Sequence, residues 1–221
     1  MKNIEMTDKE KELLADAYPT ADQIMSGALY RYQESGLRML RAGAEYLKEK
    51  YPDADIALLS FEPANKFTPW AVLRFRCGEL GIYQAVVTPK EGEDVCTDTL
   101  YGAFLRPDYD GMIERLLARE GLGLHSYTSF PNPVGMELGA GANAEKLLEV
   151  KPRLPRHTHL FVGGGEDRVL ADSLRQRLCD AGVYGSYTLF FTGEDGNGDV
   201  QELESNRRGY ARLTFNCFDV A

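Results

Sequence analysis

The sequence predicts an α+β protein, with N-terminal helices packed on an antiparallel sheet and a second, smaller half of helix and sheet. Three observations predict this class. Residues 1–51 carry apolar side chains three and four positions apart, the period of amphipathic helices. Residues 56–88 instead hold short apolar or alternating runs bounded by glycine and proline, as strands do. A similar succession of strand, helix and strands fills residues 157–218.

The first fifty residues are expected to be helical in two or three pieces. Thr7 and Glu10 have the spacing of a capping box, which predicts a short helix over residues 7–17. Thr20 and Gln23 repeat this spacing ahead of a second apolar stripe.

The central helix of the first half is predicted over residues 37–51, with Gly36 separating it from the preceding segment. Its apolar side chains share one face, and they are Leu37, Leu40, Ala44, Leu47 and Tyr51. Pro52 ends the helix because proline lacks the backbone donor that the helical ladder needs.

Three strands are predicted to form an antiparallel meander with one face on this helix. They cover residues 56–61, 70–77 and 82–88. The middle strand alternates strictly, which places Leu73 and Phe75 on the buried face. The acidic stretch 91–97 is predicted to be a loop.

The middle of the chain is predicted to separate two lobes. Residues 100–106 fit a strand or a helix, Pro107 is expected to end that element, and another helix follows up to Gly121. Glycine and proline then become frequent, with one short helix at 143–149. The predicted parts are an N-terminal lobe, a connection and a C-terminal lobe, at residues 1–121, 122–155 and 156–221. A single compact domain is the alternative.

The last third is predicted to hold a strand, a helix and two further strands. These elements cover residues 157–162, 166–181, 187–192 and 209–218. The pattern A-x-L-x-F-x-C occurs at both 71–77 and 211–217, each time after a helix and an apolar strand. The second lobe is therefore a candidate degenerate repeat of the first, although any half-buried strand selects similar inward residues. The shared phase predicts that Leu213 and Phe215 are buried.

Composition excludes several classes of partner. The chain has 221 residues and a formal net charge of −9, which repels phosphate backbones and argues against nucleic-acid binding. No apolar run reaches the roughly 18 residues of a membrane helix. The charged N-terminus lacks the apolar core of a signal peptide, so a soluble, cytoplasmic protein is expected. The scattered cysteines, with Cys96 the most exposed, are expected to be reduced thiols, and they are Cys77, Cys96, Cys179 and Cys217.

Two glycine-rich segments have the outline of ligand sites but are expected to be structural turns. Residues 163–165 lie between a strand and a helix, as phosphate-binding turns do. Glu166 and Asp167, however, place carboxylates in the first helical turn, where they repel anions and complement the helix dipole. Residues 195–199 begin like a calcium loop, but Val200 stands where that loop requires glycine. No phosphate, nucleotide or calcium ligand is therefore predicted.

Two histidines suggest a metal site. His157 and His159 are two apart on a predicted strand and therefore share a face, as ligands of a divalent transition metal would. His125 is the remaining histidine and the candidate third ligand, with an acidic side chain as the alternative. This set defines the second functional hypothesis, a small metal-assisted hydrolase. The first hypothesis requires no cofactor and treats these histidines as polar surface.

The preferred hypothesis is a non-catalytic binding or regulatory module. Trp70, Arg74, Arg76 and Tyr83 are predicted to lie near one open sheet face. Mixed arginine and aromatic side chains suit a protein or peptide interface, whereas a covering helix is the structural alternative. The module is expected to bind a protein or peptide through this face or through a cleft between its halves.

Overall fold

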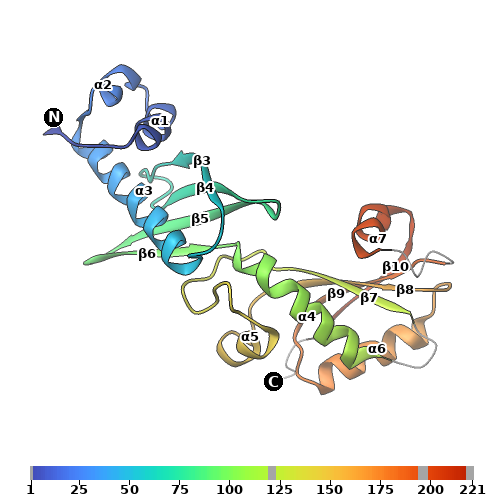
Figure 1. Ribbon diagram of the computed structural model, residues 1–221. Coiled ribbons are helices and arrows are strands. Elements are labelled where there is room, and N and C mark those ends of the chain that lie inside the picture. Colours follow the sequence, from blue (N-terminus) through green and yellow to red (C-terminus); the bar gives the residue numbers. More distant parts are fainter. Residues whose placement is uncertain (1, 119–122, 194–198, 218–221) are drawn as a thin grey trace. The chain divides into compact units, whose positions relative to one another are not determined.

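The computed structural model describes residues 2–118, 123–193 and 199–217, which form an α+β protein as the sequence predicts (Figure 1). The chain divides into two compact units. Unit 1 comprises Met1–Tyr101 and Pro133–Ala140, and unit 2 comprises Gly102–Asn132 and Gly141–Ala221. The predicted division assigned residues 102–121 to the first lobe, whereas the structure groups them with unit 2.

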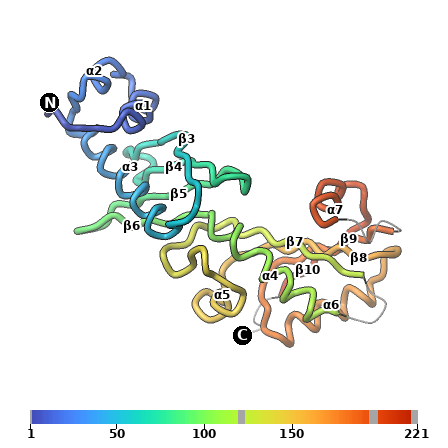
Figure 2. Tube along the Cα trace, viewed as in Figure 1, coloured from blue at the N-terminus to red at the C-terminus, as the bar shows by residue number. Residues whose placement is uncertain are grey.

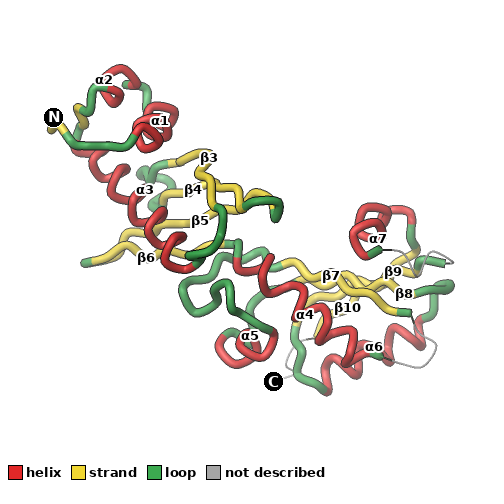
Figure 3. Tube along the Cα trace, in the orientation of Figure 1, coloured by secondary structure: helices red, strands yellow, loops and turns green. Residues whose placement is uncertain are grey.

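Unit 1 contains a four-stranded antiparallel sheet, called sheet B here, in the order β3-β4-β5-β6. Its elements are β1 (Lys2–Asn3), α1 (Asp8–Ala17), α2 (Ala21–Met25), β2 (Ala28–Leu29), α3 (Arg31–Lys50), β3 (Ile56–Glu62), β4 (Ala71–Cys77), β5 (Gly81–Lys90) and β6 (Glu93–Asp98). Figure 3 shows α3 running along one face of this sheet. The predicted meander of three strands is therefore confirmed.

The prediction of an acidic loop after the meander is wrong, because that stretch is the fourth strand, β6. β5 extends to Lys90, and β6 pairs with it from Glu93 onward. Only residues 91 and 92 make the turn, and Gly92 adopts the left-handed backbone (φ 93°) that such a turn needs. Acidic side chains at the surface are compatible with an edge strand, so charge alone was a poor guide here.

The break predicted at Gly36 does not occur, because α3 begins at Arg31 and runs through this glycine. A Cβ at Gly36 would lie 2.2 Å from the hydroxyl oxygen of Tyr18. Glycine is therefore present to let Tyr18 pack on the helix, and helical packing outweighs its low helix propensity.

The two predicted capping boxes have different outcomes. At α1 the box is formed, with Glu10 N–H donating to Thr7 Oγ1 (3.2 Å) and Thr7 N–H donating to Glu10 Oε2 (2.8 Å). At α2 it is not, because the Thr20 hydroxyl accepts the side-chain amide of Gln33 (2.6 Å) instead. The second apolar stripe is correspondingly split between the short α2 and the strand β2.

Unit 2 contains a four-stranded mixed sheet, called sheet C, in the order β10-β9-β8-β7, with only β8 and β9 parallel. Its elements are α4 (Tyr101–Leu117), β7 (Leu124–Ser129), α5 (Ala144–Val150), β8 (His157–Val162), α6 (Arg168–Asp180), β9 (Gly185–Phe191), α7 (Val200–Asn206), a 3-10 turn (Arg207–Gly209) and β10 (Ala211–Cys217). Figure 1 shows α6 and α7 on opposite faces of sheet C. The sequence predicted α5, α6, β8, β9 and β10, and it missed β7 and α7.

Pro107 does not end a helix as predicted, because it lies inside the single helix α4. Proline removes one hydrogen bond of the ladder and crowds the preceding turn. Leu105 and Tyr109, on either side of it, are both fully buried. Apolar burial on both sides therefore holds the helix together across the proline.

The shared strand pattern gives the right phase in both units but not the same depth of burial. Leu73 and Phe75 of β4 are 0% exposed, as predicted. Leu213 and Phe215 of β10 are only partly buried, so that part of the prediction is wrong. The reason is position in the sheet, since β4 is central whereas β10 lies at the described edge of sheet C. An internal duplication stays a prediction.

Side chains of α4 cover the other described edge of sheet C, at β7. The N–H of Ser126 donates to Glu114 Oε1 (2.8 Å), and the N–H of Thr128 donates to Asp110 Oδ2 (3.3 Å). Arg106 Nε donates to the carbonyl of Thr128 (2.8 Å). These bonds satisfy backbone groups that an edge strand would otherwise offer to another chain.

Replacing Asp110 by asparagine is expected to stabilise unit 2 in a pH-dependent way. Burial is the main cause that raises the pKa of Asp110 to about 6, against smaller lowering effects of Thr128 and Arg106. This folded pKa exceeds the unfolded value, so the carboxyl favours folding below about pH 4 and loses that contribution as the pH rises through 6. Asp110→Asn retains an acceptor for Thr128 and should add about 2–3 kcal/mol at pH 7.5, and much less at pH 4.

Urea unfolding of the unmodified chain and of Asp110→Asn, each at pH 4 and at pH 7.5, tests this expectation. Asp108→Asn is the control, because it makes the same change two residues away, where Asp108 Oδ2 accepts the N–H of Ala144 (2.7 Å). An Asp110→Asn effect that is equal at the two pH values would contradict the raised pKa.

Candidate binding site

The face of sheet B opposite α3 is covered by no described helix of unit 1, since α1 and α3 both pack on the other face. The strand register assigns the side chains of this open face. Val72 lies opposite Val86, Arg74 opposite Gln84, and Arg76 opposite Ile82. The intervening residues of β4 are buried against α3, so the alternation that the sequence predicted positions the two arginines outward.

Trp70 directly precedes the buried Ala71 at one end of β4 and is 42% exposed. Alternation along the chain places it on the side of Val72 and Arg74. We call the surface formed by Trp70, Val72, Arg74, Arg76, Ile82 and Val86 the arginine face.

Tyr83 is not part of the arginine face, contrary to its predicted position. It is paired with Phe75 across β4 and β5, and directly opposed residues share a face. The two ring centroids are 6.2 Å apart, and the Tyr83 hydroxyl donates to the carbonyl of Leu80 (2.7 Å). Tyr83 therefore packs on the side of the sheet that faces α3.

The charges of the arginine face are weakly compensated. Arg74 Nη2 lies 3.6 Å from Glu62 Oε1, and both side chains are about 60% exposed (59% and 62%). Exposed pairs of this kind contribute roughly 0–1 kcal/mol, so another carboxylate can replace Glu62 at little cost. For Arg76, the described part of the chain provides no ion pair. The neighbouring Ile82 is 61% exposed, so cationic and apolar surface are adjacent.

A second charged cluster lies in the interior of unit 1, and the sequence analysis missed it. Lys50 Nζ donates to Asp98 Oδ2 (2.6 Å), with the two side chains 1% and 0% exposed. The hydroxyls of Tyr46 and Tyr51 donate to the same carboxylate at 2.6 Å and 2.9 Å. Burial lowers the pKa of Lys50 and raises the pKa of both tyrosines, while Asp98 opposes the shift at Lys50.

This interior cluster is structural. Asp98 also accepts the backbone N–H groups of Leu100 and Tyr101, and Lys50 donates to the carbonyls of Val134 and Gly135. Both oxygens of the Asp98 carboxylate therefore accept hydrogen bonds from groups of unit 1. Val134 and Gly135 belong to the segment Pro133–Ala140, with which the chain returns to unit 1, and its path can be followed in Figure 2. Tyr46 and Lys50, one helical turn apart among apolar residues, were the only sequence signal.

The predicted pair His157 and His159 shares one face of sheet C, as expected from the period of a strand, with ring centroids 4.8 Å apart. His159 Nδ1 lies 2.6 Å from Glu204 Oε2, and His157 Nε2 lies 3.2 Å from Thr188 Oγ1. Burial is the main cause that lowers the pKa of both rings, and the positive charge of Arg207 adds to this effect at His159. Glu204 in turn pairs with Arg207. The cluster is therefore closed by its own polar partners.

The proposed third metal ligand does not join this pair. His125 is opposite Phe161, and Tyr127 is the residue of β7 that is opposite His159. Within the described residues, no three histidine, cysteine or acidic side chains are arranged to hold a metal ion. Sequence reasoning also missed Glu204 and Thr188, because α7 was not predicted.

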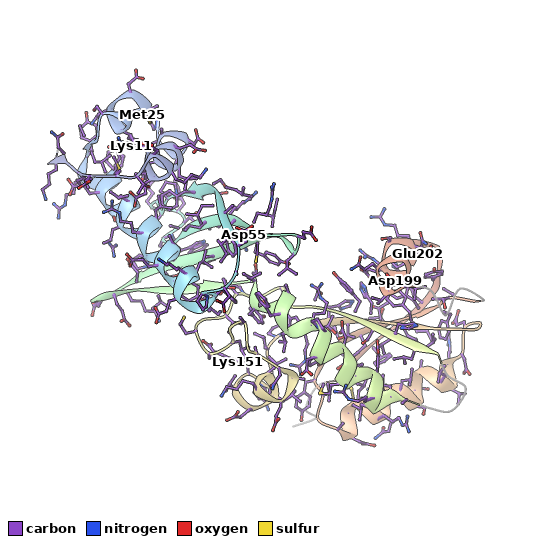
Figure 4. All side chains as sticks on the ribbon, in the orientation of Figure 1. Lys11, Met25, Asp55, Lys151, Asp199 and Glu202 are labelled. Carbon is purple, nitrogen blue, oxygen red and sulfur yellow. A yellow bond between two sulfur atoms is a disulfide. The ribbon has the colours of Figure 1, made fainter. Side chains whose placement is uncertain are left out.

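The turn at residues 163–165 is followed by a helix whose N-terminus is already capped. Asp167 accepts the N–H of Leu170 through Oδ1 (3.0 Å), which leaves a carboxylate where a phosphate would have to bind. The predicted absence of phosphate binding stays a prediction. The second glycine-rich turn, which begins like a calcium loop, covers residues 195–199, and residues 195–198 lie outside the described residues. Asp199, labelled in Figure 4, caps α7 by accepting the N–H of Gln201 (2.8 Å).

The prediction of four reduced cysteines is wrong for one pair. Cys179 and Cys217 form a disulfide, with Cα atoms 5.4 Å apart, which ties the end of α6 to β10. They are 38 residues apart, so no local motif reveals the bond. Disulfides are more usual in oxidising compartments, and the cytoplasmic location stays a prediction. Cys96 is half-buried, and burial raises the pKa of its thiol to about 11, which makes it a poor nucleophile near pH 7.

No described helix combines the length and apolar character needed to cross a bilayer. Comparisons of the chain with protein-family models, curated proteins and solved structures find no match. The functional argument therefore depends on the geometry of the two units.

Proposed function

We propose that the protein is a non-catalytic binding module and that the arginine face of unit 1 binds an acidic polypeptide segment of a partner protein. The observation that carries this proposal is the pair Arg74 and Arg76 on a sheet face that no described helix of unit 1 covers. A net charge of −9 makes such an exposed cationic area unusual for this chain.

Charge decides the chemistry of the partner. The guanidinium groups present donors that match carboxylates, and Arg74 can exchange its exposed partner Glu62 for a carboxylate of the ligand. Acidic side chains two positions apart on an extended segment project to the same side, as Arg74 and Arg76 do on β4. An extended acidic segment therefore matches the spacing of the two arginines.

Apolar contacts supply the remaining affinity. Ile82 and Trp70 are 61% and 42% exposed at opposite ends of the arginine face, and Val72 and Val86 are partly buried between them. Arginine and tryptophan are enriched at the energetic centres of protein interfaces. The expected ligand therefore combines carboxylates with at least one apolar or aromatic side chain.

The second hypothesis, a metal-assisted hydrolase built on His157 and His159, is not proposed. Its third ligand is not in place among the described residues, and both histidines already contact side chains of unit 2.

A selection from a displayed decapeptide library tests the proposal. Peptides enriched on the full chain are expected to carry two or more acidic residues together with an apolar one. Synthetic copies can be titrated by fluorescence, because Trp70 is the only tryptophan of the chain and lies on the arginine face. The double variant Arg74→Glu/Arg76→Glu should lose at least tenfold in affinity, since like charges then face the peptide carboxylates.

The matched control is Arg168→Glu/Arg175→Glu, which makes the same change of charge on exposed positions of α6 in unit 2. This control should bind like the unmodified chain. Enrichment of neutral or basic peptides, or unchanged affinity in the Arg74→Glu/Arg76→Glu variant, would refute the proposed function.

A further inference from the structure

The two described edges of sheet C are treated differently by the chain. Side chains of α4 occupy backbone groups of β7, whereas β10 has no backbone hydrogen bond with any described residue beyond its ladder with β9. That ladder runs from Ala211 to Cys217 without a bulge, and β10 contains no proline. Proteins usually protect edge strands by bulges, prolines or a cover, because a regular open edge pairs readily with another strand.

The hydrogen bonds of β9 determine which backbone groups of β10 are free. The N–H of Ser186 donates to the carbonyl of Arg156 (3.1 Å), and the N–H of Thr192 donates to the carbonyl of Val162 (2.8 Å). Even-numbered residues along β9 therefore direct their backbone groups toward β8. Since these groups alternate in direction along a strand, the odd-numbered residues of β9 direct theirs toward β10.

The odd-numbered residues of β9 are directly opposite the odd-numbered residues of β10. Leu213 and Phe215 therefore exchange their backbone hydrogen bonds with β9. The N–H and C=O groups of Arg212, Thr214 and Asn216 consequently point outward, away from sheet C, and all three residues are exposed. The outward groups form a set that is symmetric about Thr214.

We propose that the open edge of β10 is an interface between two copies of this chain, which pair antiparallel about a two-fold axis at Thr214. Thr214 then lies opposite the partner's Thr214, and Arg212 lies opposite the partner's Asn216. Each opposed pair exchanges two hydrogen bonds, as the hydrogen-bonded pairs of an antiparallel ladder do. Sheet C thereby continues into sheet C of the second copy, and the two-fold symmetry closes the assembly at two chains.

The same register brings apolar side chains of the two copies together. Leu213 lies opposite the partner's Phe215 in a non-hydrogen-bonded pair, the type in which facing side chains approach most closely. Both side chains are only partly buried in the single chain. They share a face with Cys217, which the disulfide ties to α6, so they lie on the side of the sheet that this helix covers. Pairing at the edge completes the burial of this apolar row.

Charge and symmetry favour a second copy as the occupant. β10 contains no carboxylate, and Arg212 is its only charged residue, so no like charges are directly opposed although the chain has a net charge of −9. The two copies of Arg212 are about 13 Å apart along the strands, which exceeds the Debye length at physiological ionic strength. The edge also offers and requires the same groups, as an isologous interface must. This interface lies in unit 2 and the arginine face in unit 1, so either proposal can fail without the other.

Sedimentation velocity of the full chain between about 5 and about 500 µM tests the proposal, because an edge of this length fits a weak, reversible dimer. The fraction with the mass of two chains should rise with concentration, and no larger species should form. Thr214→Lys places two lysines opposite each other on the two-fold axis and should weaken association at least tenfold. Ser129→Lys is the matched control, because it adds the same charge at an exposed position of β7, the edge that α4 covers. This control should associate like the unmodified chain.

Amide hydrogen exchange at the two ends of this concentration range identifies the contact. The N–H groups of Arg212, Thr214 and Asn216 should be protected only at the high concentration, whereas those of Leu213 and Phe215 should be protected at both. A chain that stays monomeric up to about 500 µM would overturn the assignment. Association of Thr214→Lys that equals that of the unmodified chain, or concentration-dependent protection that omits β10, would overturn it as well.

Discussion

Replacing Asp98 by alanine is expected to lower the unfolding free energy of unit 1 by about 3–5 kcal/mol. The substitution leaves the Lys50 ammonium buried without its counter-charge and removes the acceptor of the Tyr46 and Tyr51 hydroxyls. Urea unfolding followed by the fluorescence of Trp70, which reports on unit 1, measures the loss. A change below about 1 kcal/mol would show that the cluster does not hold unit 1 together.

Two further variants separate the buried ion pair from ion pairs in general. Glu12→Ala breaks the exposed Lys9–Glu12 pair (2.8 Å) of the same unit and should cost less than about 0.5 kcal/mol. Lys50→Met combined with Asp98→Asn removes both charges and should recover part of the stability lost in Asp98→Ala. A double variant that is less stable than Asp98→Ala would contradict the uncompensated-charge explanation.

Replacing Phe75 by alanine is expected to cost about 3–5 kcal/mol of unfolding free energy. Phe75 is 0% exposed in the central strand β4, so truncation removes buried contacts and leaves a cavity between sheet B and α3. Phe67→Ala is the matched control, because the same substitution at a side chain that is 82% exposed should cost less than about 0.5 kcal/mol. Equal losses for the two variants would mean that the phase of β4 is inverted.

The sequence was informative wherever local periodicity decides structure. Strict alternation in residues 71–77 gave the buried phase of Leu73 and Phe75 and, with it, the outward position of Arg74 and Arg76. The same period of two brought His157 and His159 to one face. These features follow from the geometry of a single strand and need no knowledge of what packs against it.

Features that depend on distant parts of the chain could not be predicted in this way. Glu204 and Thr188, which contact the two histidines, are 45 and 31 residues away from them in the sequence. The disulfide partner of Cys179, 38 residues away, is likewise set by tertiary contacts. Tyr83 was misplaced because the turn between β4 and β5 fixes the register, and a change of one residue there moves every side chain to the opposite face.

The most direct test of the proposed function is an NMR titration of the isotope-labelled full chain. The decapeptide that binds most tightly in the library selection is added, and the shift of each backbone amide signal is followed. Signals of Val72, Arg74, Arg76, Ile82, Gln84 and Val86 are expected to shift together and to saturate with the affinity measured through Trp70. Amides in the middle of α3, behind the sheet, should change little. Shifts centred on α3 or on unit 2, with the signals of β4 and β5 unmoved, would contradict the assignment of the arginine face as the binding site.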